Sequence, residues 1–244
     1  MSQFEDLFVN RVSDTGDFMK TMKQLDVVVP SVQYLYDGDT ISKVTDEAIN
    51  EVFNEFSCEI VGEWISQDPA SDDPTNILGG IGKFLTPLQT INIPVLEGTE
   101  ENYKMYGCSI VNKGETFQID SQGVMPLFEM EISYDYGKTF ILSEKFANGM
   151  YLEYHNMPHL YYKKEDNASG YLILGKKITS NKYALSAIRI PCKTLIYIPP
   201  FVIHNDCFLI GKYCVAYNKS SDFSTVRMLT QKDGLTFFTG VNFI

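Results

Sequence analysis

Short apolar runs separated by turn residues fill the chain from residue 77 to its end, and this pattern constrains the fold more than any other feature. The runs are rich in Tyr, Phe, Ile and Val, which favour strands, and Gly, Asn, Asp and Pro interrupt them. Examples are LFEMEISY, GMYLEYH, KTLIYIP and CFLIGKYCVAY. Many short strands of this kind are typical of a sandwich or barrel. The sequence therefore predicts a mainly β protein, with residues 77–244 forming a β-sandwich or β-barrel domain.

The N-terminal part of the chain has a different pattern, which predicts helices. Apolar residues between 3 and 25 lie roughly on one helical face. A stronger helix is predicted from Thr45, a suitable N-cap, to Trp64, because apolar residues recur at three- and four-residue steps. The segment 66–76, SQDPASDDPTN, concentrates Pro, Asp and Ser and is the expected boundary. We thus expect a mostly helical extension over residues 1–76.

The charge of the chain argues against two classes of partner. Its 31 acidic and 20 basic side chains give a formal net charge of −11, which repels nucleic-acid phosphates and anionic lipid. No run of about 18 apolar residues is present that could span a bilayer. We therefore expect neither nucleic acid nor a membrane as a partner.

Two features bear on the cellular compartment. Glu5 and Asp6 stand where a secretory signal would carry basic residues. The five cysteines are odd in number, widely spaced and without a C-x-x-C pair, as expected of buried thiols in a reducing compartment. The sequence therefore predicts a cytoplasmic protein.

All three histidines of the chain fall in two β-type stretches, GMYLEYHNMPH and IPPFVIHND. His155 and His159 are four positions apart, so an extended chain would direct both to one face. Glu153, two positions before His155, would face the same way and could supply a carboxylate. His204 ends an apolar strand, where polar groups at a barrel mouth form sites. Because imidazoles from adjacent strands can converge on one ion, we predict a metal site of His155, His159 and His204.

Simpler structural roles remain open for the same residues. A histidine beside a proline is commonly a hydrogen-bonded structural residue, and this reading applies to His155. Asn205 and Asp206 most commonly form a turn. Tyr161 is a candidate acid or supporting group, but tyrosines in strands often reflect β propensity alone.

The second histidine stretch resembles the second motif of the cupins, a family of small jelly-roll barrels. That motif is written G-x5-P-x-G-x2-H-x3-N. Pro199 and His204 reproduce its P-x-x-x-x-H frame, Phe201 stands at the middle Gly, and Phe208 stands at the final Asn.

The first stretch resembles the first cupin motif, G-x5-H-x-H-x3,4-E-x6-G. Gly149 and His155 match its opening, and Gly175 matches its final Gly. Met157 stands at the second His, with His159 two positions later. Ala168 falls at the motif's Glu, which Glu165 could replace through a bulge.

The resemblance implies a cupin-like jelly-roll β-barrel with an N-terminal helical extension. It implies a divalent metal, Fe, Mn, Ni or Zn, held by His155, His159 and His204. It further implies an enzyme acting on a small polar molecule, of lyase, isomerase or dioxygenase class, with Glu153, Tyr161 and His204 as catalytic residues. Because cupins frequently dimerise, a homodimer is also expected.

Two other functions fit the same residues. One is a metal-free cupin, in which His204 acts as general base and Tyr161 as acid. The other is a non-enzymatic module that binds a small ligand or a protein. Fold-level analogy alone does not choose among them.

Overall fold

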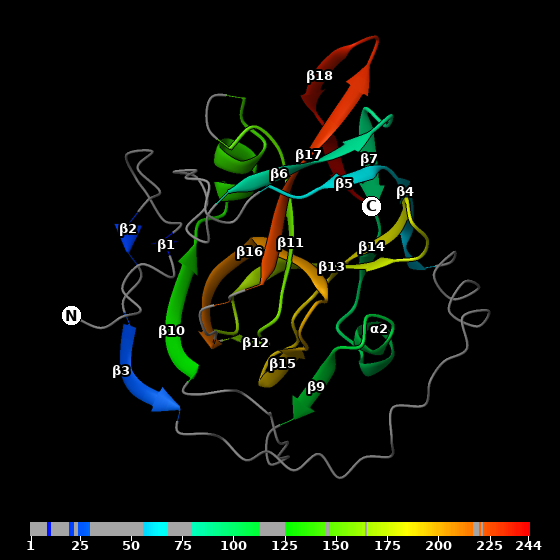
Figure 1. Ribbon diagram of the computed structural model, residues 1–244. Coiled ribbons are helices and arrows are strands. Elements are labelled where there is room, and N and C mark those ends of the chain that lie inside the picture. The colour runs from blue at the N-terminus through cyan, green and yellow to red at the C-terminus, as the bar shows by residue number, and fades with distance from the viewer. Residues whose placement is uncertain are drawn as a thin grey trace.

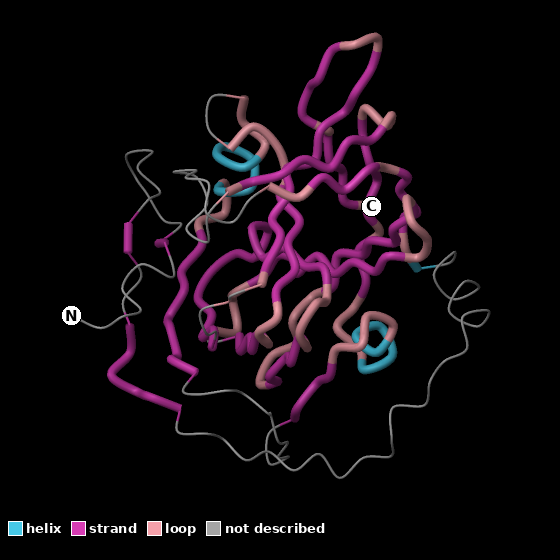
Figure 2. Tube along the Cα trace, viewed as in Figure 1, coloured by secondary structure: helices cyan, strands magenta, loops and turns pink. Residues whose placement is uncertain are grey.

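The computed structural model describes residues 56–67, 80–112, 125–144, 147–163, 165–216, 220 and 222–244, and the backbone of three short strands nearer the N-terminus. Strands dominate these residues (Figure 2). The prediction of a mainly β protein is therefore confirmed.

Eight strands lie side by side in what we call the main sheet (Figure 1). Their order is β4 (Cys58–Val61), β14 (Lys182–Ile188), β13 (Ser169–Lys177), β16 (Ile203–Ala216), β11 (Tyr151–His155), β17 (Phe223–Lys232), β6 (Ile81–Thr86) and β5 (Glu63–Ile65). Neighbours are antiparallel except β17 and β6, which are parallel. At its margins β8 (Val95–Leu96) pairs with β14, and β18 (Leu235–Phe238) pairs with β17.

A second set of strands forms what we call the side sheet. Its order is β3 (Gln24–Val29), β10 (Met125–Ile132), β16, β12 (His159–Lys163), β15 (Thr194–Ile198) and β9 (Ser109–Asn112), all antiparallel. In Figure 1, β3 and β10 lie at the left, and β12, β15 and β9 lie below the main sheet.

The strand β16 belongs to both sheets. Residues 203–210 pair with β13, whereas residues 211–216 pair with β10. Gly211 stands at the passage with a φ of 94°, a left-handed conformation that favours glycine. A Cβ at this position would lie 2.9 Å from Cα of Ala168, so the close approach also requires glycine. One continuous strand therefore fixes the two sheets to each other.

The main sheet curls without closing into a barrel. Its two edge strands, β4 and β5, are separated along the chain by Gly62 alone, but they pair with β14 and β6 and not with each other. A Cβ on Gly62 would overlap the ring of Phe84, so glycine lets the chain cross close to the core at this point. The closed barrel expected from the sequence is therefore not found.

The predicted helix from residue 45 to 64 is wrong over its last turns, because β4 and β5 occupy residues 58–65. Within β4, Ile60 is buried between exposed Glu59 and Val61, which is the alternation of a strand. Residues 41–55 and most of the expected boundary at 66–76 lie outside the described residues. In the predicted helical region 3–25, the described residues are the strands β1 (Val9–Asn10), β2 (Lys20–Thr21) and the start of β3.

Few helices occur among the described residues. The helix α2 (Glu100–Lys104) is capped by Thr99, whose side chain accepts a hydrogen bond of 3.3 Å from the Asn102 amide. A single π-helical turn, η1, covers Gly137–Ile141. The strands β7 (Thr90–Ile93) and β19 (Gly240–Phe243) form a separate parallel pair. None of the described helices is long and apolar enough to cross a membrane.

Candidate metal centre

The three histidines gather at the junction of the two sheets. His155 ends β11, His159 begins β12, and His204 is the second residue of β16. Each is at most 4% exposed, and the ring centroids are 4.4 Å apart for His155–His159 and 4.9 Å for the other two pairs. One ring nitrogen from each lies within 4.8 Å of the others. The three side chains are therefore close enough to hold one metal ion.

Cross-strand register explains how the main sheet contributes two of these residues. Glu153 on β11 lies directly opposite His204 on β16, so both side chains share one face. His155, two positions after Glu153, shares this face because side chains alternate along a strand. Tyr154 lies opposite Ser224 and faces the other way. We call the first of these surfaces the histidine face.

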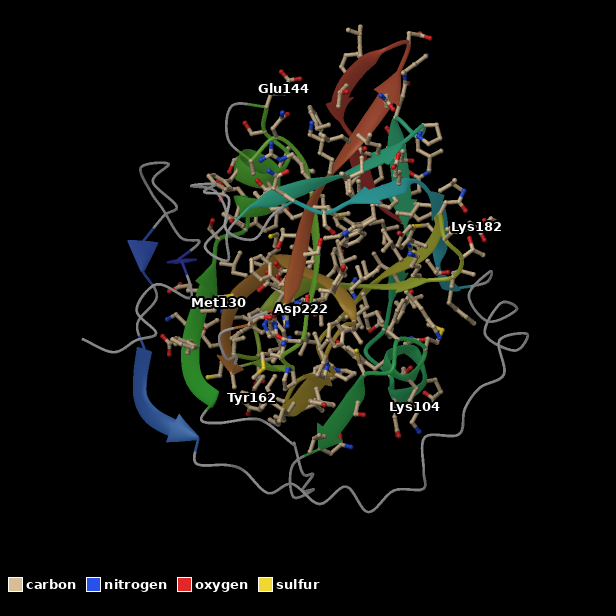
Figure 3. The ribbon with its side chains drawn as sticks, viewed as in Figure 1. Lys104, Met130, Glu144, Tyr162, Lys182 and Asp222 are labelled. Carbon is tan, nitrogen blue, oxygen red and sulfur yellow. The ribbon has the colours of Figure 1, made fainter. Side chains whose placement is uncertain are left out.

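His159 reaches the cluster by a different path from the one expected. The sequence predicted that an extended chain would carry His155 and His159 on one face, but the chain turns at residues 156–158 between β11 and β12. Asn156 in this turn donates its backbone N–H to the carbonyl of Asp222 at 2.8 Å. Asp222, which is labelled in Figure 3, directly precedes β17. His159 therefore approaches the histidine face from the side sheet.

A buried chain of hydrogen bonds holds His159 in one orientation. The Tyr161 hydroxyl donates to Oδ2 of Asp206 at 3.1 Å and lies 3.0 Å from Nδ1 of His159. Because a phenol has one proton, which here points to the carboxylate, Nδ1 of His159 must be the donor to the phenol oxygen. Nε2 of His159 then carries the lone pair, which is the form of imidazole that binds metal.

His204 is held in the same tautomer by the backbone. Its Nδ1 lies 2.9 Å from the carbonyl oxygen of Val202, which can only accept, so Nδ1 carries the proton. Its Nε2 is buried and makes no hydrogen bond with any described residue. A buried nitrogen lone pair on a ring whose centroid lies 4.9 Å from those of two other imidazoles fits a metal ligand.

His155 is neutral at ordinary pH. Burial, and after it the neighbouring His204, lower the pKa of His155 from 6.5 to about 3. A neutral imidazole is the form that coordinates metal, so this site needs no proton release from His155 before it binds an ion.

Glu153 places a carboxylate beside the cluster. Its Oε1 lies 3.5 Å from Nε2 of His204, and its Oε2 accepts a hydrogen bond of 3.3 Å from the hydroxyl of Thr225. Its side chain is 23% exposed, whereas that of His204 is 1% exposed. Glu153 thus stands between the histidines and solvent, where it can add negative charge to a bound cation or accept a proton.

Asp206 is a site residue that the sequence interpretation missed. A turn was the simpler interpretation of Asn205 and Asp206, but both are buried within β16. The register shifts here, because positions 205–208 of β16 lie opposite positions 171–173 of β13. Asn205 fixes this bulge by accepting a hydrogen bond of 2.9 Å from the Cys207 amide. Bulges re-aim side chains near sites, and here Asp206 meets Tyr161. The apolar residues on both sides of His-Asn-Asp, FVI before and CFLI after, were the available signal for a strand.

The other carboxylate considered from the sequence lies elsewhere. Glu165 pairs with Lys212 at 3.6 Å, and Ala168 packs where β16 changes sheets, close to Gly211. The structure thus brings together His155, His159, His204, Glu153 and Tyr161, adds Asp206, and leaves Glu165 outside.

Comparisons of the chain with protein-family models, with curated proteins and with solved structures found no match. The class of protein is therefore defined by the fold and site alone, as a mainly β protein with a buried cluster of three histidines.

Proposed function

We propose that the protein is a metal-dependent enzyme that acts on a small polar molecule, with a divalent metal held by His155, His159 and His204. The observation that carries this proposal is the convergence of three buried imidazoles, two of which are held with Nε2 unprotonated. A cluster fixed in this way is costly to bury for structural purposes alone, because ring nitrogens in a core require partners.

The residues around the cluster have defined roles in this proposal. Such a metal, when bound, would act as a Lewis acid or activate a bound water or oxygen. Tyr161 and Asp206 orient His159, and the Val202 carbonyl orients His204. Glu153 is the only one of these groups with appreciable exposure, so it is the residue that accepts a proton from a substrate.

The resemblance to the cupins belongs to the proposal as well. Phe201, which stands at the middle Gly of the second motif, has a φ of 65°. This is the left-handed conformation that a glycine adopts easily. A left-handed backbone at the position of a motif glycine is what we expect if the His204 stretch has the backbone shape of that motif. This supports a cupin-like origin for the His204 stretch.

A metal-free function is the second candidate, and one contact favours it. The Glu153 carboxylate lies 3.5 Å from Nε2 of His204, which is the arrangement of an acid–base pair. Tyr161 fits less well as its acid partner, because it is fully buried and already bonded to Asp206. Ligand binding without turnover would instead indicate the third function, a binding module.

Elemental analysis of the purified protein tests the proposal. The protein should be prepared without a histidine tag or chelator, and compared with His204→Gln, which keeps a polar side chain. We expect about one equivalent of a divalent metal in the parent and at least a tenfold loss in the variant. A folded parent without metal, which also fails to bind Zn²⁺, Fe²⁺, Mn²⁺ or Ni²⁺ on addition, would refute the metal site.

A further inference from the structure

A groove lies on the opposite face of the main sheet from the histidines. Its volume is about 720 Å³, within the range of about 300–1,000 Å³ usual for small-molecule sites. Tyr154 lines it, and Tyr154 points away from the histidine face. Gly175 and Ile203 line it as a directly opposed pair, one position away from His204. The groove and the histidine cluster are therefore two separate places on one sheet.

Aromatic rings form one part of the groove. Trp64 lies 5.3 Å from Tyr154 and 6.0 Å from Tyr183, with its plane within about 34° of both. The indole N–H donates to the hydroxyl of Ser224 at 2.9 Å, which fixes the ring. Aromatic surfaces held in place in this way are suited to contact with a flat apolar group.

Phe201 adds a ring that is unusual in two respects. It is 55% exposed, and its backbone is held at a φ of 65°, a left-handed conformation that is strained for a non-glycine residue. Its amide donates to the carbonyl of His155 at 2.7 Å, and its ring lies 6.4 Å from that of Tyr154. A strained backbone that presents an exposed aromatic ring beside a groove is characteristic of a ligand contact.

Positive charge marks another part of the groove. Among the residues that the structure describes, Lys176 and Lys177 line it with one acidic side chain, Glu63, although the chain as a whole carries a formal charge of −11. The ammonium group of Lys177 lies 5.9 Å from the centre of the Tyr183 ring. Ammonium groups beside aromatic rings favour a ligand that has both a flat apolar part and an anionic group.

We propose that this groove binds a small aromatic carboxylate, with its ring against Tyr154 and Phe201 and its acidic group at Lys177. This site is independent of the proposed metal site, because Tyr154, Gly175 and Ile203, which line the groove, lie on the other face of the main sheet from the histidines.

Binding of 4-nitrobenzoate, compared with its neutral amide 4-nitrobenzamide, tests the site. Equilibrium dialysis gives the affinity, and quenching of Trp64 reports the location, because Trp64 is the only tryptophan of the chain. We expect the carboxylate to bind at least fivefold more tightly than the amide and to quench Trp64. Equal binding of the two probes, or no binding of either, would overturn the proposal.

Matched variants test whether the probe binds in the groove or at another position on the protein. Lys177→Gln should weaken 4-nitrobenzoate about tenfold, the effect of losing one charge-assisted contact. Lys182→Gln in the same hairpin, labelled in Figure 3, removes the same charge from an exposed pair with Glu59 and should leave binding unchanged. Phe201→Ala should weaken both probes. Equal affinities of Lys177→Gln and Lys182→Gln would count against the site.

The histidine cluster supplies the remaining control. His204→Gln should bind 4-nitrobenzoate as the parent does, whether or not the parent holds metal. Loss of probe binding in a folded His204→Gln protein would show that the carboxylate binds at the histidines, and it would overturn the groove assignment without affecting the proposed metal site. Circular dichroism of each variant checks its fold.

Discussion

Glu153 and His204 lie directly opposite each other across β11 and β16, with Oε1 of Glu153 3.5 Å from Nε2 of His204. Because a carboxylate beside a bound cation stabilises it, we predict that Glu153→Gln lowers metal affinity about tenfold. Competition with a chromophoric chelator measures the change. The control is Glu165→Gln, whose parent carboxylate pairs with Lys212. Equal affinities of the parent and Glu153→Gln would remove Glu153 from the site.

Tyr161→Phe should weaken metal binding by about tenfold to a hundredfold, because His159 loses the acceptor that fixes its Nδ1 proton. The variant should also lower the free energy of unfolding by about 1–3 kcal/mol, since Asp206 loses its phenol donor. Tyr162→Phe, at the next and 37% exposed position of β12, is the matched control.

The hydrogen-bonded chain of His159, Tyr161 and Asp206 predicts that substitutions of Tyr161 and Asp206 have non-additive effects on metal affinity. Asp206→Asn should act through Tyr161, so the double variant with Tyr161→Phe should lose little more metal affinity than either single variant. Independent, additive losses would show that Asp206 does not support His159 through Tyr161.

The stability of the metal-free protein should fall in mild acid. The pKa of His155 is lowered from 6.5 to about 3 by burial and by His204. Between these values the unfolded chain binds a proton that the folded protein does not, so the stability is fully present above pH 6.5 and is lost as the pH falls. We expect a loss of about 2 kcal/mol between about pH 7 and about pH 5 in urea unfolding. His155→Gln should remove this slope, and an unchanged slope would contradict the prediction.

Cysteine labelling should follow exposure and thiol acidity. Burial raises the pKa of Cys58 from 9.0 to about 11, which reduces its thiolate about a hundredfold at mildly alkaline pH. Burial raises the pKa of Cys108 further, whereas Cys192 is exposed. Iodoacetamide followed by peptide mass analysis should therefore modify Cys192 first. Cys192→Ser should abolish the fast phase, and fast labelling of Cys58 would contradict its burial.

The β content could be predicted because strand signals are local. Runs such as those of β13 and β15 combine β-branched or aromatic residues with flanking turn residues. Residues 58–65 were wrongly predicted to be helical because the spacing of Ile60, Val61 and Trp64 also fits a helix. In the structure these residues form strands that pair with β14 and β6. Pairing between distant segments is not visible in one sequence. The open edges of the main sheet could not be predicted for the same reason.

The histidine cluster was predicted, but partly for the wrong reason. The even spacing of His155 and His159 suggested that they share one strand face. Instead, His155 ends β11 of the main sheet and His159 begins β12 of the side sheet, with a turn between them. Asp206 was overlooked because Asn-Asp is a common turn pair. In the structure, a bulge in β16 places the Asp206 carboxylate beside Tyr161. Side-chain partners that depend on a bulge cannot be read from composition.

The passage of β16 from one sheet to the other has a consequence for the kinetics of metal exchange. Since this strand is continuous through Gly211, moving the sheets apart to release an ion from the proposed site would require breaking the pairing of β16 with β13 or with β10. We therefore expect that release of an ion from the proposed site would begin with fraying of the short connection at residues 156–158, beside the Asp222 carbonyl. The dissociation rate should thus follow amide hydrogen exchange in that connection, independently of the global unfolding rate.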